Sequence, residues 1–187
     1  MMINPPYLTL ERTAGIFLVL TGIATFPGFM LFWLRRGHQG GSPRNHAQWV
    51  VERSSILSGV VLIAIGFRLL QSVLQGTAGA CLMDIGATAY FFGGILGVVA
   101  ETLMLTLGYE KVYGLIVVYV VMAFLAEAAV GGAIIQSGLL AALIGWVTIL
   151  WNIASLIGLA LLSRRDMYFP VLHYVMPLVI GIALLSK

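Results

Sequence analysis

Long apolar stretches alternate with short polar stretches along the whole chain. A bilayer core of ~30 Å needs about 20 apolar residues in a helix, so each long stretch predicts a transmembrane helix. The six predicted helices cover about residues 13–34, 47–75, 85–108, 112–135, 139–163 and 170–185, and the last one is short. The pattern therefore predicts an all-α polytopic membrane protein, a six-helix bundle in one integral membrane domain, residues 1–187.

The connections between these stretches are brief, except for residues 35–46, which contain the turn-forming residues Gly, Ser and Pro. Tight turns at 109–111 and 136–138 are expected to make the helices on either side antiparallel neighbours. Asp84 stands just before the third helix, where it is expected to cap the N-terminus.

Composition places most of the chain in hydrocarbon. Hydrophobic residues make up 60% of the chain and charged residues only 9%, whereas a soluble domain has roughly a quarter charged. The net charge is +3, but the cations gather in the connections, which is typical of membrane topology. We therefore expect the lipid bilayer as a partner and no nucleic acid.

Lysine and arginine are distributed unequally between the two ends of the predicted helices. One end collects Arg35, Arg36, Arg44, Arg53, Lys111, Arg164 and Arg165, and the other has Arg12 and Lys187. The positive-inside rule places the first end in the cytoplasm. Both termini and the single cysteine, Cys81, are then expected on the non-cytoplasmic side.

Polar side chains inside the predicted helices are informative because they are costly in lipid. The candidate site residues are Arg68, Glu101, Glu127, Asn152 and His173. Counted from the cytoplasmic end at ~1.5 Å per residue, Glu127 lies roughly 24 Å deep and Arg68 roughly 22 Å deep. An Arg68–Glu127 ion pair is therefore expected. Glu101 lies only about 10 Å deep, so its expected neighbours are His173 and Arg53.

Asn152 lies about 16 Å deep on the fifth predicted helix. It is expected to face protein, because an amide facing lipid would leave its donors and acceptors unpaired. With Thr25 and the charged residues it forms a predicted polar track through the bundle. Such a track either fixes the register of the helices or marks an ion path.

Small residues and prolines interrupt the apolar helices. Gly93 and Gly97 form a small-xxx-small face, which predicts close helix packing within the bundle or a surface for self-association. Pro27 and Pro177 each remove one helical hydrogen bond. The free carbonyls of a broken helix can bind an ion. The favoured interpretation for both prolines is that each only kinks its helix and packs inside the bundle.

The sequence contains no motif for known catalytic or metal chemistry. The patterns CxxC, HExxH, GxSxG and GxxxxGK[ST] are all absent. We therefore expect no catalytic residue, no metal site and no cofactor. An enzyme is the least favoured class.

The two ends of the chain carry a resemblance to known membrane proteins. The stretch "LERTAGIFLVLTG" (10–22) begins the first predicted helix. The stretch "SRRDMYFPVLHYVMPLVIGIALL" (163–185) has basic residues and a proline before the last predicted helix. These stretches, with the arginine-rich turn between the first two helices, resemble uncharacterised bacterial six-helix integral membrane proteins. The resemblance implies a fold but no activity and no functional residue. We expect a location in the bacterial inner (cell) membrane.

Two functional hypotheses remain. The first is transport or channel-like handling of protons, ions or a small solute by the polar track, in a homo-oligomer. It predicts polar residues that converge on a wet cavity. The alternative is a non-catalytic integral subunit of a larger membrane complex. It predicts paired polar residues, no cavity and glycine-rich faces turned outward.

Overall fold

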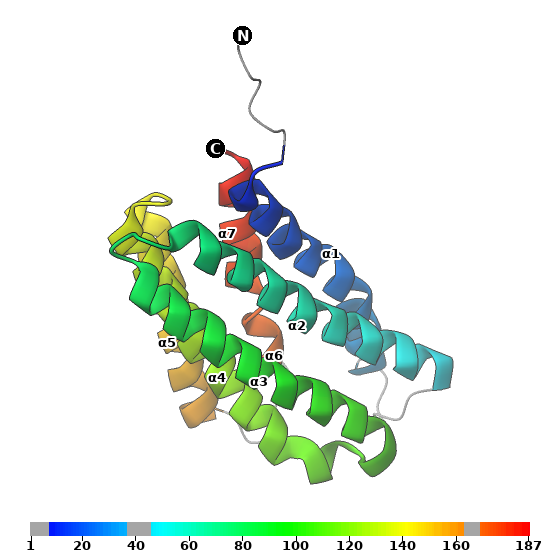
Figure 1. The fold of residues 1–187 in the computed structure, drawn as a ribbon. Helices are drawn as coiled ribbons and strands as arrows, with labels where there is room; N and C mark the ends of the chain where they lie inside the picture. Colours follow the sequence, from blue (N-terminus) through cyan, green and yellow to red (C-terminus); the bar gives the residue numbers. More distant parts are fainter. Residues whose placement is uncertain (1–7, 37–45, 163–168) are drawn as a thin grey trace.

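The computed structural model describes residues 8–36, 46–162 and 169–187, and every regular element in these ranges is a helix (Figure 1). The helices are α1 (Leu10–Arg36), α2 (His46–Leu74), α3 (Ala80–Leu107), α4 (Tyr109–Ser137), α5 (Ala142–Leu162), α6 (Phe169–Leu172) and α7 (Val175–Leu185). Five helices, α1 to α5, are long and apolar enough to cross a membrane. The all-α prediction is confirmed, and so are five of the six predicted spans.

The sixth predicted span differs from the structure, because it is broken into α6 and α7 at His173 and Tyr174. Pro177 explains the position of the break. A proline removes the hydrogen bond to the carbonyl four residues earlier and its ring clashes with that carbonyl, which here belongs to His173. In the first turn of α7 the same proline is tolerated, since no N–H partner exists there. α7 has only 11 residues, about 16 Å of helix.

Glycines in the left-handed region form the sharp turns. Gly108 (φ 79°) alone connects α3 to α4, and Gly138 (φ 65°) ends α4. Asp84 does not cap α3, because the helix begins four residues earlier, at Ala80. Its carboxylate instead accepts a hydrogen bond from Gln71 Nε2 at 2.7 Å.

Small residues allow the helices to approach closely. α1 packs extensively along α2, and α3 along α4, whereas the contact between α2 and α3 is smaller. A Cβ atom at Gly93 would lie 2.9 Å from Met122 Cβ, and one at Gly97 would lie 3.0 Å from the Tyr119 ring. The glycine face of α3 therefore packs inside the bundle, against α4.

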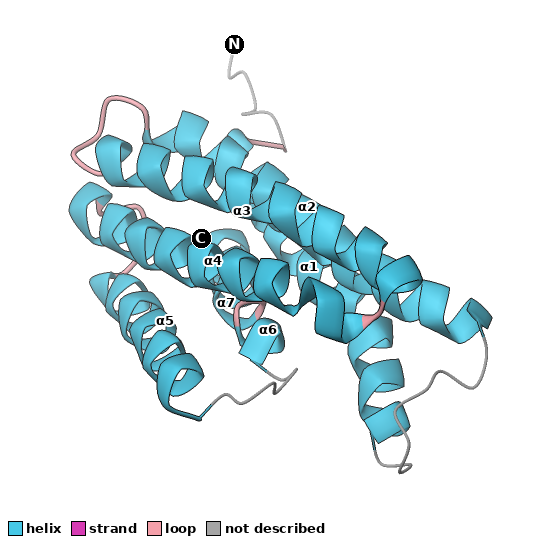
Figure 2. Cartoon of the chain, turned by 90° about the horizontal axis from the view of Figure 1, so that it is seen from below, coloured by secondary structure: helices cyan, strands magenta, loops and turns pink. Residues whose placement is uncertain are grey.

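The outer surface of the bundle is rich in large apolar side chains, with Leu161 78% and Leu143 71% exposed. Such a surface suits lipid. The first and last helices lie together (Figures 1 and 2), and Lys187 Nζ lies 2.9 Å from Glu11 Oε1. Both ends of the described chain are thus on one face of the bundle. Arg44, Arg164 and Arg165 lie outside the described residues, and the side of the membrane that each face meets stays a prediction.

Candidate functional site

His173, in the break between α6 and α7, is the centre of a fully buried polar cluster. Its Nε2 atom shares a hydrogen bond of 2.6 Å with the hydroxyl of Tyr119 on α4. Its Nδ1 atom lies 3.4 Å from Glu127 Oε1, two turns further along α4. Because residues eight apart lie on the same face of a helix, α4 presents Tyr119 and Glu127 to opposite edges of one imidazole ring.

Asn152 on α5 completes this cluster. Its amide lies beside the Glu127 carboxyl group, but it donates its hydrogen bond to the carbonyl of Thr148 at 2.8 Å. The prediction that Asn152 faces protein is confirmed, since the residue is fully buried. We call Tyr119, Glu127, Asn152 and His173 the histidine cluster.

The histidine cluster holds most of the unpaired polar atoms in the described core. Both carboxyl oxygens of Glu127, His173 Nδ1 and Asn152 Oδ1 are buried without a hydrogen bond, as is the hydroxyl of the neighbouring Tyr90. Buried polar groups are nearly always bonded, so each exception needs an explanation. Bundle packing alone would favour apolar residues here, and this concentration therefore makes the histidine cluster the candidate functional site.

Aromatic rings surround the imidazole on several sides. Tyr174 lies closest, with ring centroids 3.9 Å apart, and Tyr119 meets it edge to face at 5.3 Å. Phe124 and Tyr90 lie at 6.5 and 6.1 Å. The Tyr174 hydroxyl is held by the carbonyl of Ile56, 3.0 Å away on α2. This packing fixes the plane of the His173 ring.

A second polar cluster lies nearer the end of the bundle that carries α6. Arg53 Nη1 donates to Glu101 Oε2 at 3.0 Å, and Nη2 pairs with Glu52. The guanidinium also stacks on the Trp49 ring, 4.5 Å from its centroid. We call Glu52, Arg53 and Glu101 the arginine cluster. It is a charged network with its acids paired, unlike the histidine cluster.

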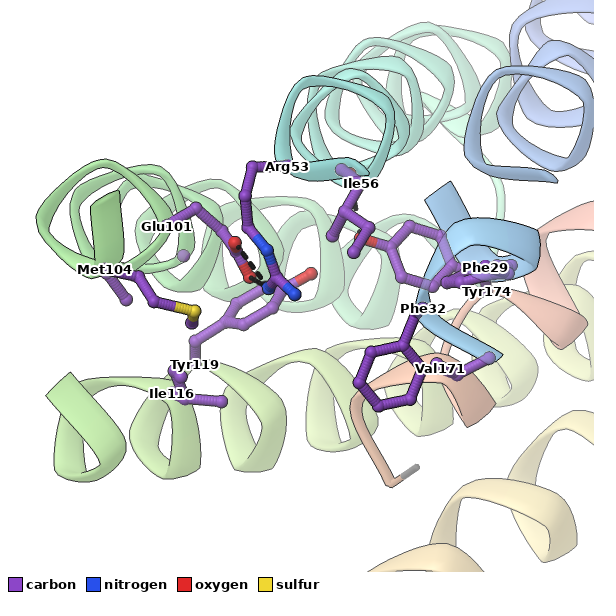
Figure 3. Close-up of a pocket in the computed structure, with 12 residues that line it drawn as sticks. Phe29, Phe32, Arg53, Ile56, Glu101, Met104, Ile116, Tyr119, Val171 and Tyr174 are labelled. Atoms are coloured by element: carbon purple, nitrogen blue, oxygen red, sulfur yellow. Dashed lines mark hydrogen bonds and ion pairs between the residues drawn. The ribbon is translucent and has the colours of Figure 1, made fainter. Parts of the chain in front are cut away.

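A small cavity joins the two clusters (Figure 3). Arg53 and Glu101 line one part of it, and Tyr119 and Tyr174 line another. Its volume is about 40 Å³, more than the roughly 10–15 Å³ that one water molecule requires. Polar groups therefore continue from Glu101 through a water-sized space to Tyr119, His173 and Glu127.

The described polar path ends at Glu127 and Asn152, because the buried Thr148 one turn beyond Asn152 uses its hydroxyl for the carbonyl of Ile144 in its own helix, at 2.8 Å. Beyond Glu127, α4 contains only apolar residues and glycine as far as Ile135. Neighbouring buried side chains at this end, such as Leu74, Met83 and Ile134, are apolar as well. In the part of the chain that the structure describes, the path is thus open toward the arginine cluster and closed toward the face with the termini.

The predicted Arg68–Glu127 pair is wrong. Arg68 is exposed on the outside of α2, where it bonds to Gln71. The buried face of α2 contains Ile63, Phe67 and Leu70. Arg68 does not lie on that face. A residue count along the helix gives only a depth, and it leaves the direction around the helix axis undetermined.

The other predicted contacts are partly correct. Glu101 pairs with Arg53, as expected, but His173 contacts Glu127 and Tyr119 instead of Glu101. The Thr25 hydroxyl bonds to the carbonyl of Thr21 in its own helix at 2.8 Å, so it does not join the cluster.

Sequence reasoning missed Glu52 and the buried tyrosines. Tyr119 could have been found from its spacing of eight residues to Glu127, which places both on one helical face. Tyr90 and Tyr174 could not be separated by sequence from tyrosines at a membrane interface. Among the described residues, no three His, Cys, Asp or Glu side chains are grouped as a metal site would require.

The fold and this buried polar site define a helical integral membrane protein. Comparisons of the chain with protein-family models, with curated proteins and with solved structures found no match.

Proposed function

We propose that the protein transfers protons within the membrane interior, with His173 as the relay. The observation that carries this proposal is the position of His173 between Tyr119 and Glu127. A neutral imidazole has one donor and one acceptor nitrogen. The imidazole accepts the Tyr119 proton at Nε2 and releases its own proton from Nδ1 to Glu127, while Tyr119 takes up a proton from water in the adjoining cavity. The reverse transfer uses the same atoms.

The distances suit a relay that operates in steps. The contact between Tyr119 and His173 is a short hydrogen bond, whereas 3.4 Å between Nδ1 and Oε1 exceeds the ordinary range of 2.7–3.2 Å. Transfer to Glu127 then requires the two groups to approach by a few tenths of an ångström. His173 lies in a helix break, where the backbone is not held by a continuous hydrogen-bond ladder.

The size of the cavity favours protons over a small solute as the transported species. A space of about 40 Å³ admits water but no larger solute. Water in this space would link Glu101 to Tyr119. Because the described path ends at Glu127, transport across the membrane requires a second state in which Glu127 or His173 reaches the other face.

Proton flux into vesicles tests the proposal. The purified chain is reconstituted with a pH dye inside, and a potassium gradient with valinomycin supplies the driving force. Wild type should acidify the lumen faster than empty vesicles. Glu127→Gln and His173→Phe should each lower the rate by roughly a hundredfold, the usual effect of a lost proton-transfer group.

Glu11→Gln is the matched control, since it removes a partly exposed carboxylate from the pair with Lys187. This variant should keep the wild-type rate. A wild-type rate equal to that of empty vesicles would contradict the proposal, and so would full activity in both core variants.

The alternative of a non-catalytic subunit has less support. It predicted no cavity and outward glycine faces, but a cavity adjoins the polar core and the face of Gly93 and Gly97 packs against α4. A homo-oligomer, the bacterial inner membrane and the orientation with both termini outside the cytoplasm remain predictions.

A further inference from the structure

A long groove opens on the outer surface between α2 and α3, away from the polar core. It has a volume of about 590 Å³ and is lined almost entirely by apolar side chains. Phe91 is 57% exposed, Ile95 46% and Val61 44%, so the groove is open along its side. In a bundle of this composition that side faces the hydrocarbon of the bilayer. The smaller contact between α2 and α3 accounts for the opening.

The length of the groove matches one leaflet. Along α3 its lining runs from Ala87 to Val99, about 18 Å at 1.5 Å per residue. One leaflet contributes half of a ~30 Å hydrocarbon core, about 15 Å. The groove can therefore hold an extended acyl chain from its headgroup end to the middle of the membrane.

One end of the groove is polar and carries an arginine. Arg68 lines this end, six residues before the end of α2. Its guanidinium bonds to Gln71 Oε1, while Gln71 Nε2 donates to Asp84. Gln71 thus separates the two charges, and among the described residues no carboxylate pairs directly with Arg68.

Thr88 supplies an independent observation in the same groove. Threonines in helices usually bond to a carbonyl three or four residues earlier, as Thr102 does to Val98 at 2.8 Å and Thr106 to Leu103 at 3.1 Å. Thr88 also lines the groove and is exposed, but its hydroxyl has no hydrogen-bond partner among the described residues. A free hydroxyl one turn below Asp84 suits an ester or phosphate oxygen.

We propose that this groove binds an anionic phospholipid, with one acyl chain between α2 and α3 and the phosphate at Arg68. An arginine fork matches a phosphate by two parallel hydrogen bonds, and the rest of the lining matches an acyl chain. The bilayer supplies this ligand at high concentration. The site is separate from the histidine cluster, and it does not depend on proton transfer.

Lipid retention measured by native mass spectrometry tests the proposal. The full chain is equilibrated in nanodiscs of equal phosphatidylglycerol and phosphatidylcholine, released, and scored for the bound lipid. Wild type should retain phosphatidylglycerol preferentially. Arg68→Gln should reduce that preference roughly fivefold, the effect of one basic side chain near an anionic lipid surface. Ala64→Phe fills the groove but keeps Arg68, and it should abolish lipid retention.

Arg12→Gln is the control, because it removes an exposed arginine from α1, outside the groove. It should retain lipid as wild type does. If Ala64→Phe does not fold, Thr88→Val is the second variant: it removes the free hydroxyl in the groove and should weaken retention by a smaller factor. The proposal is wrong if wild type shows no preference for the anionic lipid, or if Arg68→Gln and Arg12→Gln act equally. It is equally wrong if a cysteine at Val61 cross-links to the same position of a second copy, since the groove would then hold protein.

Discussion

Two glutamates inside the same bundle have opposite surroundings. Glu101 accepts two hydrogen bonds from Arg53, and its side chain is 13% exposed. Glu127 is fully buried, its oxygens have no hydrogen bond, and its nearest basic group is the imidazole of His173. An arginine cannot release its proton in a protein, but a histidine readily gains or loses one.

This difference suits Glu101 to holding the fold and Glu127 to the proposed proton relay. The charge of Arg53 is permanent, so Glu101 is held as the anion of an ion pair and contributes to the packing of α2 against α3. In the proposed relay, the partner of Glu127 passes on a proton, so the state of the pair can vary while the fold stays intact. The two sites therefore predict opposite responses to mutation.

Glu101→Leu is expected to have the largest effect on stability. It leaves the guanidinium of Arg53 buried with only Glu52, and a broken buried pair is destabilising by about 3–5 kcal/mol. Partial exposure of Glu101 places the expected loss near the lower value, about 3 kcal/mol. Thermal melts in detergent measure it, with Glu11→Leu, which removes a partly exposed carboxylate, as the control. A melt equal to wild type would show that the pair has no structural role.

Gly59→Ala tests the position of Tyr174, which lies between the clusters. A Cβ atom at Gly59 would lie 2.1 Å from Thr25 Cγ2 and 2.6 Å from Tyr174 Cε1, so both Thr25 and the ring that covers His173 must move. We expect a loss of about 2 kcal/mol, typical of an overpacked core, together with slower proton flux. Gly114→Ala is the control, because nothing lies within 4 Å of its new Cβ. Equal melts for the two variants would contradict the prediction.

Asn152→Leu should have a smaller effect. The substitution removes one hydrogen bond to Thr148, which contributes about 1 kcal/mol, and also the unpaired Oδ1 atom. Folded yield and the detergent melt should fall slightly, and more than for Ile153→Ala on the exposed face. A variant that behaves as wild type in both measurements would show that this amide makes no net contribution.

Glu127→Leu should change stability least. Because Arg68 is not its partner, no guanidinium is left without a counterion, and the substitution removes two unpaired buried oxygens. The melt should lie within about 1 kcal/mol of wild type, while proton flux is lost. A loss as large as that of Glu101→Leu would mean that the two carboxylates have the same role.

The sequence predicted the spans better than the contacts between them. Helix length and apolar composition identify α1 to α5 because the bilayer imposes the same requirement on each. Pro27 was expected to kink or pack, and α1 continues through it. Pro177 instead lies in the first turn of α7, just after the break at His173 and Tyr174, and the loss of one hydrogen bond alone does not distinguish the two prolines.

Contacts in the core depend on rotation about each helix axis, which residue counts do not supply. Arg68 and Glu127 were matched by depth alone, and they face in different directions. Glu101 and Arg53 were matched correctly because both lie near the same end, where few other charged groups compete. The link from His173 to Glu127 depends on the break between α6 and α7, which sets the depth of the ring.

The shortness of α7 has a consequence for biogenesis. About 16 Å of helix covers roughly half of a ~30 Å hydrocarbon core, so this segment is a poor signal for the insertion machinery. It must be stabilised by docking on α1, its main neighbour, once the long helices are in place. Assembly of the C-terminal segment is then a late step, and His173 enters its site only when the rest of the bundle has already formed.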